Sequence, residues 1–371
     1  MASTDASRFE QRPVLVFWEL TRACPLACAH CRASALRERL PGELSTAQGT
    51  ALLESLHDFG PPYPTLILTG GDPLSHPDLW SIIARARALG LNVAVSPAVS
   101  PRLSRAVLDR FRALGVASIS LSLDGAQAST HETLRQSPGH FAQTLEAIDL
   151  AQDAGLRVQV NSTVTGASAT EGPELFQLLR DRGVPVWEVF FLIRTGRGAG
   201  LRELTSSEAE DVCHFLYDAS QYGMVIRAVE APFLRRVLRA RQAGAPPPPS
   251  PLYRSLRSRL EGSAGPATRP SSLAPVGTLD GDGILFIGHD GTIHPGGLAP
   301  EALGRFPERR PAEVYRSSPT LRSIRRREFH GACGRCAHRA YCGGSRARAL
   351  AATGDILGTD PACLRAASTE A

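Results

Sequence analysis

The stretch that decides the fold lies at residues 24–31 and reads CPLACAHC. It places Cys24, Cys28 and Cys31 in a C-x3-C-x2-C spacing directly after a short apolar run that predicts a β-strand. Three thiolates on one loop can hold three irons of a 4Fe–4S cluster and leave the fourth iron open. A structural zinc ion, with His30 as the fourth ligand, is the alternative. Because His30 and Cys31 are adjacent, they are poorly placed to bind the same zinc ion in a closed tetrahedral site. The spacing therefore favours the cluster.

Outward from this loop, apolar runs typical of strands alternate with amphipathic stretches typical of helices. We expect strands at 14–19, 65–69, 91–95, 118–123, 157–164 and 187–192, and helices at 47–59, 79–89, 103–114, 141–154, 175–182 and 207–222. Glycines in C-cap positions end several of these helices: Gly60, Gly90, Gly115, Gly155 and Gly183. Six such units predict an α/β fold with a parallel sheet, either an open barrel or a doubly wound sheet. In both architectures the active site lies at the carboxyl ends of the strands.

The strand–helix pattern ends near residue 240, which divides the chain into 1–240, 241–275 and 276–371. The Pro-rich run AGAPPPPSP at 243–251 predicts neither strand nor helix, so we expect a linker or surface loop over 241–275. The last part should begin with a β-hairpin that turns at HDG, residues 289–291. The sequence after this hairpin lacks apolar periodicity, so metal ligation should supply much of the folding energy of this part.

Composition narrows the class of protein. No apolar run approaches the roughly 20 residues of a membrane span, and segment 1–12 has no signal-peptide core, so we expect a soluble cytoplasmic protein without a membrane partner. The net charge of +5 gives no strong footprint for nucleic-acid binding. All 41 basic residues are Arg, which excludes chemistry that needs Lys.

Seven of the eight cysteines form two tight groups, which in a cytosolic chain indicates metal sites. The eighth, Cys213, is expected to pack in the core.

With this cysteine spacing after the first strand of a six-unit sheet, the chain resembles the radical S-adenosylmethionine (SAM) superfamily over nearly its whole length. The resemblance implies a partial (β/α)6 TIM-type barrel. It implies that Cys24, Cys28 and Cys31 hold a 4Fe–4S cluster whose open iron binds SAM. It also implies an enzyme that reductively cleaves SAM to a 5′-deoxyadenosyl radical, which abstracts hydrogen from a substrate. An electron donor such as flavodoxin or ferredoxin is the implied partner.

Weaker matches lie at other strand ends. TGGDP at 69–73 resembles the family's GGE motif for the SAM amino group, although Asp replaces the usual Glu; alone it would be an ordinary turn. SLSLDG at 120–125 resembles a ribose-contacting segment, and TGRG at 195–198 resembles a Gly-Arg-Gly segment of relatives. The SAM contacts implied by the resemblance are His30 near the adenine, Gly70, Gly71, Asp72, Pro73, Ser122 at the ribose and Asn161 at the methionyl part.

The second cysteine group has the spacing C-x2-C-x5-C, followed by a distant fourth cysteine, and suits zinc or an iron–sulfur cluster about equally. The runs CGGSRARA at 342–349, TGD at 353–355 and DPAC at 360–363 resemble the C-terminal SPASM or twitch extension, which carries auxiliary clusters. Ser345 stands where heme-synthesis relatives have Cys, and the hairpin end at 295–297 also lacks one. The resemblance therefore implies one auxiliary 4Fe–4S cluster held by Cys333, Cys336, Cys342 and Cys363, for electron transfer or support of the fold.

The sequence does not decide between three classes of substrate. The preferred hypothesis is modification of a peptide, which would require a separate peptide-carrier protein because only thirteen residues precede the first expected strand. The alternative is oxidation or decarboxylation of tetrapyrrole side chains, which an Arg-rich mouth with Arg194 and Arg197 would suit. A small-molecule substrate is also open. A non-catalytic zinc-binding scaffold would explain both cysteine groups but not the TGGDP motif.

Overall fold

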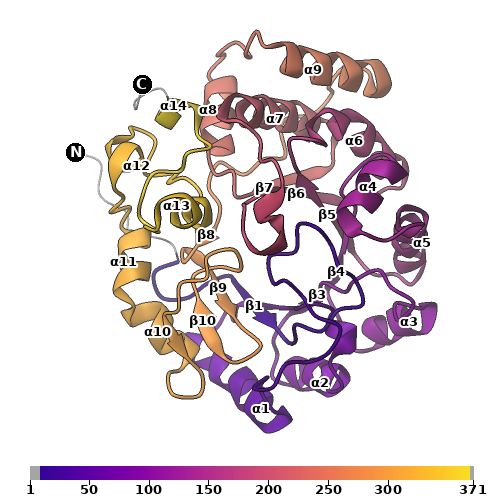
Figure 1. The fold of residues 1–371 in the computed structure, drawn as a ribbon, viewed down its shortest axis with the longest axis vertical. Helices are drawn as coiled ribbons and strands as arrows, with labels where there is room; N and C mark the ends of the chain where they lie inside the picture. The colour runs from indigo at the N-terminus through magenta and orange to yellow at the C-terminus, as the bar shows by residue number, and fades with distance from the viewer. Residues whose placement is uncertain (1–8, 368–371) are drawn as a thin grey trace.

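The computed structural model describes residues 9–367 of the 371-residue chain, so most of the polar segment 1–12 lies outside the described residues. One curved sheet runs through the molecule, with most of the helices on its outer side (Figure 1). Its strands follow the order β11-β10-β9-β1-β2-β3-β4-β5-β6-β7, with β8 beside β9. The sheet ends at β7 and β11, so this is an open barrel of the predicted TIM type.

The first seven strands are parallel and pair in chain order. They are β1 (Leu15–Glu19), β2 (Thr65–Thr69), β3 (Val93–Val95), β4 (Ser118–Ser122), β5 (Val158–Val164), β6 (Val186–Phe191) and β7 (Val225–Val229). Six of them confirm the expected strands to within two residues. The seventh, β7, was not expected, because Arg227 interrupts its short apolar run.

Helices connect these strands and cover the barrel. They are α1 (Thr46–Ser55), α2 (Leu79–Ala88), α3 (Arg105–Ala113), α4 (Ala128–Arg135), α5 (His140–Asp153), α6 (Gly172–Asp181), α7 (Ser206–Ala219) and α8 (Leu234–Gln242). The five glycines expected as C-caps all have positive φ, between 65° and 77°, which confirms their role. Helix α4 was not expected. Cys213 is fully buried in α7, as predicted.

The expectation of a loop throughout 241–275 is wrong for its middle part. Helix α9 (Pro251–Ala264) begins after the N-cap Ser250, with Pro251 at its first position. Proline is tolerated there because the first helical N–H has no intrahelical partner. The helix buries Tyr253, Leu256 and Leu260 and packs against α6 and α7.

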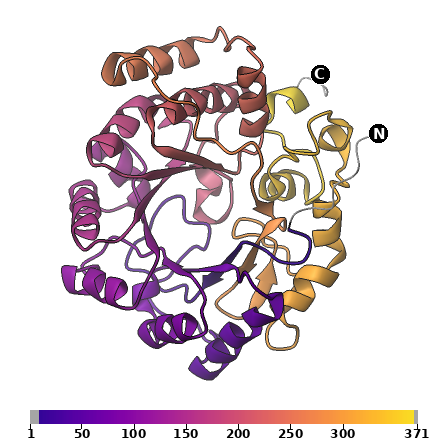
Figure 2. The same ribbon diagram turned by 180° about the vertical axis from the view of Figure 1, so that it is seen from behind.

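The last part of the chain continues the barrel sheet instead of standing apart from it. The predicted hairpin is confirmed as β9 (Gly283–Ile287) and β10 (Thr292–His294), and β9 also pairs in parallel with β1. Its remaining elements are β8 (Leu279–Asp280), β11 (Gly304–Arg305), α10 (Pro311–Ser317), α11 (Pro319–Arg325), α12 (Gly331–Arg335), α13 (Arg346–Thr353) and α14 (Leu364–Ala367). From behind, these elements close the side of the barrel next to β1 (Figure 2). None of the described helices is long and apolar enough to cross a membrane.

The end of β2 lies directly against the loop that follows β1. The backbone N–H of Gly71 donates to Thr21 O at 2.7 Å. A Cβ on Gly71 would lie 2.5 Å from Ala23 O and 2.7 Å from Arg22 O, closer than van der Waals contact allows. The position therefore requires glycine to let the two backbones approach.

We predict that Gly71→Ala destabilises the protein by about 1–3 kcal/mol, because overpacking a close backbone contact forces the cysteine loop to shift. The matched control is Gly262→Ala in the exposed part of α9, where an added Cβ meets no atom within 4 Å. That variant should leave the free energy of unfolding unchanged or raise it by up to about 1 kcal/mol, because alanine has a higher helix propensity than glycine. Anaerobic equilibrium unfolding measures both, and equal stabilities of the two variants would contradict the packing argument.

Candidate functional site

The first three cysteines lie on the loop that leaves the carboxyl end of β1. This loop folds back on itself through a 2.7 Å hydrogen bond from Cys24 N–H to Leu36 O. The backbone N–H groups of Leu26 and Ala35 donate to the sulfurs of Cys24 and Cys31, at 3.4 and 3.5 Å. Hydrogen bonds to cysteine sulfur stabilise the thiolate form and tune an iron–sulfur cluster.

The cysteines open onto a cavity of about 710 Å³ inside the barrel. The predicted site residues in its wall are Cys24, Cys28, His30, Cys31, Gly70, Gly71, Ser122 and Asn161. Two other predicted contacts, Asp72 and Pro73, are not among its lining residues. The ends of β1, β2, β4 and β5 thus converge on one cavity, whose volume falls within the roughly 300–1,000 Å³ of ligand pockets.

Asp72 supports this wall from behind. Its Oδ1 accepts hydrogen bonds from the N–H groups of Leu74 and Ala98 at 3.1 and 3.2 Å. Its Oδ2 is buried and has no hydrogen-bond partner among the described residues. Burial raises the pKa of Asp72 to about 6. An ammonium group or a proton would satisfy the unpartnered oxygen, and the predicted contact with the SAM amino group stays a prediction.

A buried ion pair that the sequence did not reveal lies behind the cysteine loop. Arg135, the last residue of α4, places Nε 2.7 Å from Asp124 Oδ2 and donates from Nη1 to Cys28 Sγ at 3.7 Å. Burial opposes the charge of Asp124, but Arg135 and then His30 lower its pKa to about 2. Burial lowers the pKa of His30, which also lines the cavity.

Arg197, in the Gly-Arg-Gly segment after β6, binds the cysteine loop through two hydrogen bonds to its backbone. It donates from Nε to Cys28 O at 2.8 Å and from Nη1 to Ala35 O at 2.9 Å. Its Nη2 is buried without a partner among the described residues, although Arg197 lines the cavity. That free donor suits an anionic group of a ligand. Arg194, expected beside it, is exposed and does not line the cavity.

Three carboxylates also line the cavity and were missed by sequence reasoning: Glu188, Glu230 and Asp280. Burial raises the pKa of all three, and the charge of Glu230 raises that of Asp280 further. Ser345 donates its hydroxyl to Glu230 Oε2 at 2.5 Å. Glu188 lies within β6, whereas Glu230 follows β7 and Asp280 ends β8. Each is a lone acidic residue, and no spacing rule distinguishes it from a surface carboxylate.

The four cysteines of the second group line a separate cavity of about 210 Å³. The sequence predicted this set, and the structure brings Cys333, Cys336, Cys342 and Cys363 together around one space. Burial raises the pKa of Cys342 to about 12 and also raises that of Cys333.

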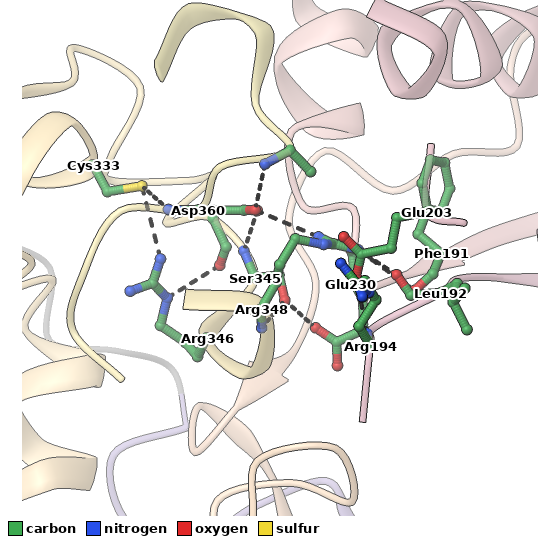
Figure 3. A network of polar contacts seen from close by, with 12 residues as sticks. Phe191, Leu192, Arg194, Glu203, Glu230, Cys333, Ser345, Arg346, Arg348 and Asp360 are labelled. Atoms are coloured by element: carbon green, nitrogen blue, oxygen red, sulfur yellow. Dashed lines mark hydrogen bonds and ion pairs between the residues drawn. The ribbon is translucent and has the colours of Figure 1, made fainter. Parts of the chain in front are cut away.

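A network of polar contacts links this second cavity to the barrel (Figure 3). The N–H of Asp360 donates to Cys333 Sγ at 3.4 Å, and its Oδ2 accepts from Ser345 N–H at 2.7 Å. Arg348 lies 3.4 Å from Asp360 Oδ1 and donates to the backbone carbonyl of Leu192, just after β6, at 3.2 Å. The second cysteine cavity is therefore held rigidly against the end of the barrel.

Both cysteine sets fit iron–sulfur clusters. Burial raises the pKa of Cys24 to about 12, so a thiolate there needs a positive metal centre beside it. Among residues 9–367, no three His, Cys, Asp or Glu side chains are arranged to share a single metal ion. In a cluster each cysteine binds its own iron, so the thiols lie around the cluster and not around one ion. Three thiols beside a large cavity suit an open cluster, and four around a small one suit a closed cluster.

Comparisons with known proteins agree with this site. The radical SAM superfamily profile matches residues 18–171. The chain is 35% identical to the AdoMet-dependent heme synthase of Nitratidesulfovibrio vulgaris, over 94% of this chain and 91% of that protein. It is 32% identical to pre-heme d1 synthase of Dinoroseobacter shibae, over 98% and 89%. It is 30% identical to the mycofactocin maturase of Mycobacterium ulcerans, over 95% and 88%.

Among solved structures, SAM-bound SuiB of Streptococcus suis superposes with a TM-score of 0.66 at 12% identity, over 95% of this chain and 78% of SuiB. This likeness confirms the TIM-type barrel fold. Fold and site together define an iron–sulfur enzyme with its cofactor cavity at the carboxyl ends of parallel strands. The chain belongs to the radical SAM superfamily, in the branch of heme-synthesis enzymes and peptide maturases with SPASM-type C-terminal regions. Its cofactors are a 4Fe–4S cluster and SAM.

We predict that Arg135→Met destabilises the protein by about 3–5 kcal/mol, because it leaves the Asp124 carboxylate buried without a cation. The control is Arg105→Met, which removes an exposed pair with Asp109 on α3 and should change stability by less than about 1 kcal/mol. Anaerobic urea unfolding compares the two. A small effect at Arg135 would show that Asp124 finds another partner.

Proposed function

We propose that this radical SAM enzyme abstracts a hydrogen atom from a carboxylate-bearing side chain of a tetrapyrrole. The observation that carries the proposal is nearly full-length similarity, at 35% and 32% identity, to two enzymes named for heme and pre-heme d1 synthesis. The hydrogen atom leaves a substrate C–H bond and ends on 5′-deoxyadenosine, and the unpaired electron stays on the substrate carbon. The electron that cleaves SAM comes from the electron donor. The peptide substrate preferred from the sequence becomes the second candidate.

In this proposal each part of the cavity wall has a role. Cys24, Cys28 and Cys31 hold the SAM-binding cluster, which together with SAM supplies the 5′-deoxyadenosyl radical. Close backbone approach at Gly70 and Gly71 leaves room for SAM, with Ser122, Asn161 and His30 as its side-chain contacts. Arg197 keeps the cysteine loop in place through two backbone carbonyls.

The cavity supports a flat, partly apolar substrate with charged edges. Phe190 and Phe286 contribute aromatic surface to its wall, which suits a macrocycle. Arg227 and the unpartnered Nη2 of Arg197 offer guanidinium donors to substrate carboxylates. Arg227 is exposed at this wall and makes a 3.2 Å hydrogen bond to Gln159.

A peptide is the second candidate, favoured by the 30% identity to a mycofactocin maturase over 95% of this chain. The three cavity carboxylates could accept hydrogen bonds from peptide N–H groups or bind a basic side chain. A separate peptide carrier would then be the expected partner. For either substrate, a flavodoxin or ferredoxin is the expected electron donor.

We further propose that Cys333, Cys336, Cys342 and Cys363 hold one auxiliary 4Fe–4S cluster. Their common 210 Å³ cavity and the buried thiol of Cys342 support this assignment. Residues 276–371 would then form the auxiliary-cluster region on a barrel core of 1–240, although β9 joins the two in one sheet.

We predict about eight irons per chain after anaerobic reconstitution, because two 4Fe–4S clusters are present. Cys28→Ala and Cys336→Ala should each lower the count to about four. With SAM and dithionite, 5′-deoxyadenosine should form in the wild type and in Cys336→Ala but not in Cys28→Ala. Zinc in place of iron, with SAM left intact, would overturn both cluster assignments and favour a zinc-binding scaffold.

The substrate class is tested by isotope transfer. Iron coproporphyrin III deuterated in its propionate side chains should pass deuterium to 5′-deoxyadenosine, and product mass then shows whether carbon dioxide has left. Iron octaethylporphyrin, which has the same ring without carboxylates, is the control and should give no transfer from its side chains. Deuterium transfer from a candidate peptide, and none from the porphyrin, would reverse the assignment.

A further inference from the structure

A fully buried arginine contacts one of the cysteines that line the second cavity. Arg346, the first residue of α13, is 1% exposed. Its Nη2 donates to Cys333 Sγ at 3.7 Å (Figure 3). Its remaining N–H groups donate to three backbone carbonyls, those of Gly344 at 3.2 Å and of Ile356 and Gly358 at 2.9 Å. The guanidinium is thus fixed in place, with one donor aimed at a thiol that we assign to the auxiliary cluster.

The charge of Arg346 is not neutralised by a direct ion pair. Within the described residues no carboxylate lies at ion-pair distance from its guanidinium. The acidic group nearest to the same thiol, Asp360, is 0% exposed and is paired with Arg348 instead, at 3.4 Å. Arg346 therefore contributes a full positive charge in a low-dielectric region, where its effect on a neighbouring charge is strong.

The first cysteine site contains a similar arginine whose charge is neutralised. Arg135 donates to Cys28 Sγ at the same distance, 3.7 Å, but its Nε lies 2.7 Å from Asp124. The Arg135–Asp124 pair has no net charge, whereas the contact of Arg346 with Cys333 adds one positive charge. The two sites thus have the same donor to sulfur, but only the arginine at Cys28 is paired with a carboxylate.

We propose that Arg346, acting through Cys333, raises the reduction potential of the auxiliary cluster and so separates it from the potential of the SAM-binding cluster. Reduction adds one negative charge to a cluster, and a fixed positive charge and a hydrogen bond to sulfur both stabilise the reduced form. The inference rests on the auxiliary cluster proposed above. It assigns a role to a side chain that lies outside the catalytic cavity.

The test uses the full-length protein with Cys28→Ala as background, so that only the auxiliary cluster contributes to the signal. Midpoint potentials are measured by anaerobic redox titration followed by electron paramagnetic resonance. Arg346→Gln, which removes the charge but keeps an amide donor, should lower the potential by at least 59 mV, a tenfold change in the equilibrium constant for reduction. Arg346→Lys, which keeps the charge, should shift it much less.

Two controls separate charge from packing. Arg339→Gln removes a charge from the wall of the same cavity. Arg339 is exposed and donates from Nη1 to Gly334 O at 2.8 Å, so solvent screening should keep the shift in potential small. Asp360→Asn removes a buried negative charge beside the same thiol and should raise the potential. Opposite shifts for Arg346→Gln and Asp360→Asn are not expected from general loosening of the fold.

Each of the following results either supports or overturns the role proposed for Arg346. An intact cluster in Arg346→Gln with an unchanged potential overturns the inference and leaves the cluster assignment standing. No iron in the Cys28→Ala background overturns the auxiliary cluster and the inference together. If Arg346→Gln fails to bind iron, a raised potential in Asp360→Asn with little change in Arg346→Lys supports the proposal. A lowered or unchanged potential in Asp360→Asn contradicts it.

Discussion

Compensation of buried charge is the constraint on which this structure depends. Burial raises the pKa of Cys24 and Cys342 to about 12, so thiolates at both sites require positive charge beside them. At the SAM-binding site the 4Fe–4S cluster supplies positive charge, and an arginine contacts a cysteine sulfur at each site. Arg135 and Arg346 each direct one donor at a cysteine sulfur from the last or first residue of a helix.

The parallel barrel brings these charges to one place. Because parallel strands end on the same side, loops far apart in sequence meet around the 710 Å³ cavity. Several contacts join the C-terminal part to this barrel. They include the pairing of β9 with β1 and the hydrogen bonds of Arg348 to carbonyls after β6 and at Glu230. These connections fix the second cysteine cavity relative to the first and make one unit of the two sites.

The cysteine loop, the strand ends and the glycine caps could be predicted because each has a local signal. Thiol spacing within eight residues decides whether three sulfurs can reach one cluster, and Gly70 and Gly71 occupy a strand end where two backbones touch. Arg197 could also be found, since it lies between two glycines. In contrast, Arg135 ends α4 and Glu230 follows β7, two short elements whose sequence patterns do not distinguish them from loops.

By itself, the sequence determined the parallel α/β units and both cysteine sets, because strand periodicity and ligand spacing are properties of neighbouring residues. Its resemblance to the radical SAM family then indicated the open barrel and the class of chemistry. Only the tertiary structure decided which buried charges are paired. Asp124, just after β4, neutralises Arg135 at the end of the next helix, whereas Asp360 pairs with Arg348 and leaves Arg346 unpaired. It also decided that α9 forms after the Pro-rich run and that β9 extends the barrel. These features depend on contacts between remote segments, and electrostatic energies are set by distance and burial in space.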